Sequence, residues 1–251
     1  MSRRLVYSWM LLVLLVGCSK AEILQKIASP QDQAYARHTI DLLRQQRFAD
    51  IEKDIDPSIA GPSVHATLVR MAEMIPSGEP TSVTLVGAHL TRADGAITTN
   101  LTFEYEFSGK WLLANVATKN QGGHMTVVGF NVVPRSISLE EQNRFTLTGK
   151  SPMQYLVLAL AVMLPMLTIY ALVACARTKL KGRKWPWILF ILIGFGKLAV
   201  NWTSGQWIAA PLSLQLFSAS AFAPLYGPWT LAVSAPVGAI AFLMLRRKLS
   251  A

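Results

Sequence analysis

Acidic residues are missing from this chain after Glu141. All 14 Asp and Glu lie between Glu22 and Glu141, and charged residues make up only 15% of the 251 residues. The 24 Lys and Arg give a formal net charge of +10, but residues 19–152 are close to neutral. The positive excess therefore flanks apolar segments. This pattern is typical of membrane topology and not of a nucleic-acid-binding face.

Cysteine pairs and catalytic motifs are also lacking. The two cysteines, Cys18 and Cys175, each lie at the edge of an apolar run, and neither has the spacing of a disulfide framework or a metal site. The four histidines are isolated from one another, and no nucleophile elbow, phosphate loop or dinucleotide fingerprint occurs. The sequence therefore predicts no catalytic residue, no metal site and no cofactor.

Residues 1–17 have the form of an export signal, with a basic start and an apolar stretch. That stretch is too short for a spanning helix, which needs about 20 residues. It ends in Leu15-Val16-Gly17-Cys18, which resembles the lipobox of bacterial lipoproteins. The resemblance implies cleavage before Cys18 and acylation of its thiol and new amino group. An uncleaved signal anchor is the alternative. Both interpretations place the following residues outside the cytoplasm.

A tether is expected at 18–29 and one α+β domain at 30–150. Ser29-Pro30 is a typical helix start, and the apolar spacing that follows predicts helices up to Pro76. The pattern then changes to strict alternation in "AITTNLTFEYEF". Four strands joined by tight turns predict an antiparallel meander with one polar face.

Helices followed by a curved antiparallel sheet resemble the nuclear-transport-factor-like (cystatin-like) α+β fold. Members of that fold have a cone shape, so the resemblance implies a pocket at the open end of the sheet. His89, Tyr105 and Trp111 are the candidate pocket residues. Ordinary positions in the core and rim of the sheet are the alternative for Tyr105 and Trp111. The fold hosts both enzymes and binding modules, so it does not decide the function.

The chain after Ser151 predicts an α-helical membrane domain of about three transmembrane helices, at 153–176, 185–202 and 227–245. Basic residues follow the first and third segments, in a loop at 177–184 and a tail at 246–251. By the positive-inside rule these residues determine the topology and lie in the cytoplasm: they are Arg177, Lys179, Lys181, Arg183, Lys184, Arg246, Arg247 and Lys248.

Segment 203–226 is apolar but carries two prolines, and its "LSLQL" alternates as a strand does. We expect an external extended or interfacial segment, with a re-entrant loop or a fourth span as alternatives. Lys197 lies inside the second predicted span, where a charge is costly and often functional. Its side chain could instead snorkel to the headgroups.

These observations predict a bacterial inner-membrane protein with residues 18–152 in the periplasm and a cytoplasmic C-terminus. The expected function is non-enzymatic: the periplasmic domain binds or scaffolds a membrane or periplasmic protein partner. The expected partners are therefore the lipid bilayer and that protein, with no nucleic acid, and the oligomeric state is left open. A subunit of a transport complex and an enzyme with a cone-shaped pocket are the alternatives.

Overall fold

The structure is a computed structural model that describes residues 24, 26–180 and 182–250. The chain divides into two compact units, unit 1 up to Ser138 and unit 2 from Leu139. The predicted cleavage flank Leu15, Val16 and Gly17, the lipidation site Cys18 and the basic residue Lys181 lie outside the described residues.

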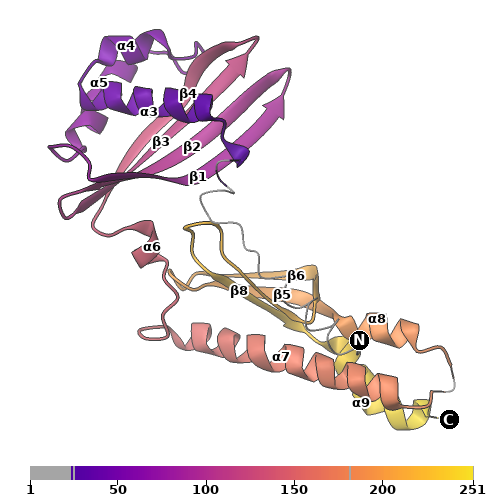
Figure 1. Cartoon of the computed structure of the whole chain (residues 1–251). Helices are drawn as coiled ribbons and strands as arrows, with labels where there is room; N and C mark the ends of the chain where they lie inside the picture. The colour runs from indigo at the N-terminus through magenta and orange to yellow at the C-terminus, as the bar shows by residue number, and fades with distance from the viewer. Residues whose placement is uncertain (1–23, 25, 181, 251) are drawn as a thin grey trace, which may run out of the picture. The chain divides into compact units, whose positions relative to one another are not determined.

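Unit 1 is an α+β fold, as the sequence predicts. Its elements are α3 (Pro30–Arg44), α4 (Phe48–Lys53), α5 (Val64–Glu73), β1 (Ser82–Ala93), β2 (Ala96–Phe107), β3 (Lys110–Gln121) and β4 (His124–Arg135). The four strands form an antiparallel meander in chain order, and the helices lie along one face of it (Figure 1). Ser29 caps α3 by accepting a hydrogen bond from the backbone N–H of Asp32 at 3.1 Å.

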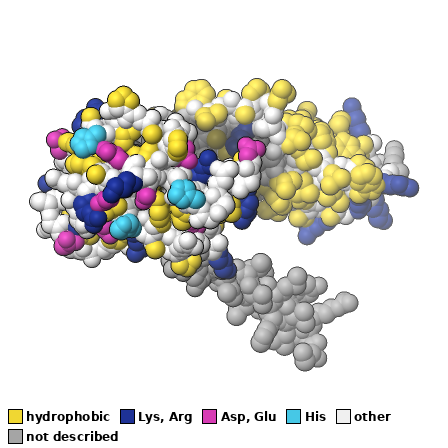
Figure 2. Space-filling view, turned by 90° about the horizontal axis from the view of Figure 1, so that it is seen from above, with side chains coloured by type: hydrophobic (Ala, Val, Ile, Leu, Met, Phe, Trp, Pro, Cys, Tyr) yellow, Lys and Arg dark blue, Asp and Glu magenta, His cyan; other side chains and the backbone are white. Residues whose placement is uncertain are grey.

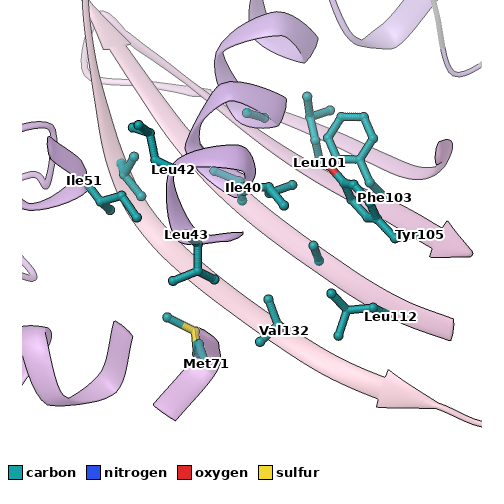
Figure 3. Close-up of a cluster of buried hydrophobic side chains, with 14 of the residues drawn as sticks. Ile40, Leu42, Leu43, Ile51, Met71, Leu101, Phe103, Tyr105, Leu112 and Val132 are labelled. Carbon is teal, nitrogen blue, oxygen red and sulfur yellow. The ribbon is translucent and has the colours of Figure 1, made fainter. Parts of the chain in front are cut away.

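The core of unit 1 lies between α3 and the sheet (Figure 3). Alternate residues of β2 point into it: Leu101, Phe103, Tyr105 and Phe107 are all buried. The opposite face is polar, and there the Asn115 side chain donates to Asn100 Oδ1 at 2.5 Å and to Thr102 Oγ1 at 2.8 Å. The alternation read from the sequence therefore assigns both faces of β2 correctly.

A buried carboxylate joins the helical layer to β4. The backbone of residues 54–56 pairs with Val127, and Asp56 is 7% exposed. Its carboxylate accepts hydrogen bonds from the Ser58 backbone and the Thr126 hydroxyl, both at 3.0 Å, and Lys119 Nζ lies at 3.6 Å. The hydrogen bonds from Ser58, followed by that from Thr126, lower the pKa of Asp56 to about 2.

Unit 2 combines helices with a second sheet. Its elements are α6 (Leu139–Gln142), α7 (Pro152–Arg177), α8 (Trp185–Leu192), β5 (Ile193–Asn201), β6 (Trp207–Leu216), β7 (Ala219–Phe222), β8 (Thr230–Ala235) and α9 (Val237–Leu249). The sheet order is β6-β5-β8-β7, all antiparallel. A capping box between Ser151 and Gln154 starts α7, and the Gln154 side chain donates to the Trp202 carbonyl at 2.7 Å.

The helix α7 packs through one stripe of its surface. Seven buried or partly buried residues recur at spacings of three and four: Gln154, Val157, Ala161, Leu164, Thr168, Ala171 and Cys175. The first half of this stripe contacts β5 and β8, and the second half contacts α8 and α9. The rest of the helix is apolar but exposed, including Met163, Met166 and Tyr170.

The prediction of about three transmembrane helices is wrong in number. Within the described residues, α7 alone is long and apolar enough to cross a membrane. The segment 185–202 is a helix only to Leu192 and continues as β5, and 227–245 is divided between β8 and α9. At 1.5 Å per residue the 13 residues of α9 extend about 20 Å, which is too short for a bilayer. Segment 203–226 contains strands β6 and β7.

Glycine explains why the apolar segment at 185–202 leaves the helical conformation. Gly196 has a positive φ of 71°, and the registers of β5 with β6 and with β8 both shift beside it. Gly194 is packed so closely that a Cβ would lie 2.1 Å from Ser234 Oγ. Hydropathy counted these residues as part of a span because it measures apolar content and not periodicity.

We expect Asp56→Asn to destabilise unit 1 at pH 7, because the charged acceptor of the link to β4 is lost. The folded-state pKa of about 2 lies below the unfolded value of about 3.9. The stabilisation is thus complete above about pH 5 and is lost as the pH falls toward 2. Hydrogen exchange of β4 peptides in the full chain should show a difference between wild type and variant that shrinks over this range.

Asp50→Asn is the matched control for this variant, because Asp50 makes exposed ion pairs with Arg47 and Lys53. Such pairs contribute little to stability, so the control should change β4 exchange less than Asp56→Asn does. A difference for Asp56→Asn that stays constant from pH 7 to about pH 2.5 would contradict this role of the carboxylate.

Candidate functional site

The three residues proposed for a cone pocket do not come together. Tyr105 is 2% exposed and lies in the core, where burial raises the pKa of its hydroxyl well above the ordinary value. It pairs with Leu112, whereas Trp111 pairs with Glu106 and therefore lies on the opposite face of the sheet. His89 is exposed on β1, opposite Asn100. The side chain of Tyr105 is packed in the core, whereas Trp111 borders a surface depression.

Trp111 lies in a surface depression of about 670 Å³ at one end of the unit 1 sheet. The turn between β2 and β3 forms one side of it, and the end of β4 forms another. The remaining wall is the loop that follows α5, residues 74–77, with Ile75 and Pro76 half-buried. The depression thus combines a half-buried indole with apolar loop residues.

Two cations border the same depression. Lys110 precedes Trp111 and is exposed, and Arg135 is the direct cross-strand partner of Trp111 on β4. The Arg135 Nε atom is buried, and among the described residues it has no hydrogen-bond partner. A buried guanidinium donor without an acceptor is costly, so a bound acceptor at this position would stabilise it. Glu73 is the one carboxylate that lines the depression.

An ion-pair cluster centred on Arg44 holds the loop that forms the wall. Arg44, at the end of α3, contacts Glu79 Oε2 at 2.6 Å and Asp41 Oδ1 at 3.2 Å. It also donates to the carbonyl of Gly78 at 3.4 Å. Burial lowers the pKa of Arg44, but the hydrogen bonds to Glu79 and Asp41 outweigh it, and the net pKa is raised. Arg44 therefore stays charged and fixes the loop after Pro76 against α3.

The groups that border this depression are suited to binding an anion. An indole beside a guanidinium and an ammonium group can hold an anionic group that carries apolar atoms. Among the described residues, no three His, Cys, Asp or Glu side chains are grouped so that they could hold a metal ion. The exposed His65–Glu52 contact at 2.7 Å borders a separate depression of about 300 Å³ next to α5.

The other predicted residues lie in unit 2. Lys197 is exposed at the bulge in β5 and borders a depression of its own. The two basic clusters are brought to the same end of unit 2, because Leu180 and Ser250 form an antiparallel bridge. Figure 2 shows an apolar surface over unit 2 with Lys and Arg gathered at that end.

Arg135 is not identified from the sequence, although part of the strand pairing around Trp111 is readable from it. The two-residue turn at Ser108-Gly109 sets Phe107 opposite Lys110 and so places Tyr105 and Trp111 on different faces. The register between β3 and β4 is not readable in the same way, because the pairing shifts between Ala117 and Thr118. Because of that shift, Arg135 on β4 lies directly opposite Trp111 on β3.

We expect Arg44→Ala to loosen the wall of the depression without unfolding unit 1. Hydrogen exchange of peptides covering residues 74–81 should become a few times faster, while exchange of β2 and β3 peptides stays unchanged. A change of this size corresponds to the small contribution that one surface ion-pair cluster makes to stability. Arg70→Ala is the control, since the hydrogen bonds of Arg70 to described residues lie within α5. Equal exchange in wild type and Arg44→Ala would show that Arg44 does not hold the loop.

Comparisons of the chain with family models, curated proteins and solved structures found no match. The likeness to nuclear-transport-factor-like domains therefore rests on the order of helices and strands in unit 1, and it stays a prediction.

Proposed function

We propose that this chain is a non-enzymatic, membrane-anchored binding protein of the bacterial inner membrane. In this proposal α7 crosses the bilayer and unit 1 binds a protein partner on the periplasmic side. The observation that carries the proposal is the surface of α7: the helix has 26 residues, and only 17% of its most apolar stretch is buried. Water is a poor solvent for such a surface, whereas the acyl chains of a bilayer are a good one.

The distribution of charge supports the proposed orientation. Both basic clusters lie at the end of unit 2 where α7 ends, and Leu180 and Ser250 are paired there. By the positive-inside rule that end is cytoplasmic, so the start of α7 and unit 1 are periplasmic. Cleavage and acylation at Cys18, which the lipobox-like sequence implies, would add a second attachment on the same side.

The Trp111 depression is the proposed contact with the partner. Its two cations and its indole suit an acidic segment that carries apolar side chains, because such a segment supplies an acceptor for Arg135 Nε and covers Trp111. The shape of the sheet end and the Arg44-held loop give this contact a fixed geometry. We therefore assign binding to this end of unit 1, with no chemical step.

Cysteine accessibility tests the orientation. In a Cys175→Ala background, we expect Asp94→Cys in unit 1 to react with a membrane-impermeant maleimide in cells with a permeabilised outer membrane. Arg183→Cys should react only after the inner membrane is broken. A Cys18→Ala version controls for labelling at the N-terminus. Equal reaction of Asp94→Cys and Arg183→Cys in intact inner membranes would overturn the proposed orientation.

Site-specific photocrosslinking in native membranes tests the contact. A photoreactive residue at position 110 should give one discrete adduct, and the same residue at Asp94, at the other end of the sheet, should give none. We expect the adduct to fall about tenfold in Trp111→Ala and in Arg135→Gln, the loss typical of one central contact. Adducts of equal yield at both positions, or an adduct indifferent to both substitutions, would refute the assignment.

A further inference from the structure

We propose that the depression at the β5 bulge, beside Lys197, binds one anionic phospholipid. The lipid phosphate would meet the Lys197 ammonium group, and an acyl chain would lie against the apolar wall supplied by α7. The inference rests on the proposed membrane anchoring by α7. It is separate from the proposed partner site in unit 1 and from the orientation of the chain.

The depression exists because β5 bulges. The registers of β5 shift between Phe195 and Lys197 on one side and between Phe195 and Leu198 on the other, around the positive φ of Gly196. A depression of about 360 Å³ borders this bulge. Most of its lining is apolar, and includes Leu160, Leu164, Leu198, Val233 and Pro236. Lys197 supplies its one charged group.

The countercharge of Lys197 cannot come from nearby in unit 2. The acidic residues of unit 2 are Glu140 and Glu141, both on α6 ahead of α7, and no Asp or Glu follows them in the sequence. Among the described residues no ion pair with Lys197 occurs. A cation beside a membrane helix is costly unless an anion neutralises it. A lipid phosphate is the anion that such surroundings offer.

The depth of the depression suits a lipid rather than a soluble anion. At 1.5 Å per residue, Leu160 and Leu164 lie about 12 and 18 Å along α7 from Pro152. A helix of 26 residues extends about 39 Å, so both leucines fall within the thickness of the bilayer. Their apolar surface gives an acyl chain a contact that a free phosphate ion cannot use. Snorkelling of Lys197 brings its ammonium group toward the headgroups.

Native mass spectrometry of the full chain in non-ionic detergent tests the proposal. We expect one phosphatidylglycerol to bind saturably and phosphatidylcholine to bind about tenfold more weakly, since its headgroup has no net charge. Lys197→Gln should lower phosphatidylglycerol binding about tenfold, the loss of one charge-assisted contact, and Lys197→Arg should retain it. Arg183→Gln removes one positive charge at the other, basic end of unit 2 and should leave this binding unchanged.

Three results would overturn the proposal. Equal binding of phosphatidylglycerol to the wild type and to Lys197→Gln would show that the Lys197 ammonium group does not contact the lipid. Equal binding of both lipids would show that the charge is not recognised. Competition by millimolar inorganic phosphate would assign the site to a soluble anion. Circular dichroism of each variant checks its folding, and the exposed position of Lys197 makes both substitutions compatible with the fold. The measurement is made in detergent, so it does not depend on the orientation or on the partner.

Discussion

The packing of α7 is the constraint on which unit 2 depends. One stripe of the helix, from Gln154 to Cys175, contacts the sheet with its first half and α8 and α9 with its second half. The two apolar clusters of unit 2 therefore both form against this one helix. The remaining surface of α7 is apolar and exposed among the described residues, and this is the physical reason for the proposal that it lies in a bilayer.

The sheet of unit 2 carries a lysine, Lys197, that requires a countercharge. Its bulge at Gly196 opens a depression next to α7, and it presents Lys197 in an apolar setting without a carboxylate to pair with. The absence of acidic residues after Glu141 thus has a structural consequence beyond topology. It leaves the two basic clusters and Lys197 without an acidic residue nearby in the sequence, and we propose a bound anion as the countercharge of Lys197.

Unit 1 has a hydrophobic core of its own, between its helices and its sheet. The helices cover the apolar face of the meander, and Asp56 fastens the helical layer to the edge strand β4 through hydrogen bonds to its carboxylate. Because the core is filled around Tyr105, the unit offers no interior cone pocket at that residue. The surface that we propose for recognition is instead at the end of the sheet, where Arg135 lies opposite Trp111 and Arg44 holds the neighbouring loop.

The amino-acid sequence by itself determined the elements of unit 1. Alternation in β2 and two-residue turns set the faces and most of the register, since a turn of fixed length leaves one pairing between its strands. The same local patterns did not distinguish the apolar segments of unit 2, because a buried strand and a membrane helix have similar composition. There the positive φ of Gly196 and the close packing of Gly194 favour the strand β5 over a continued helix. The meeting of Arg135 with Trp111, and of both basic clusters at one end, likewise depends on contacts between distant residues. Only the tertiary structure contains these contacts, because they join residues that no local pattern relates.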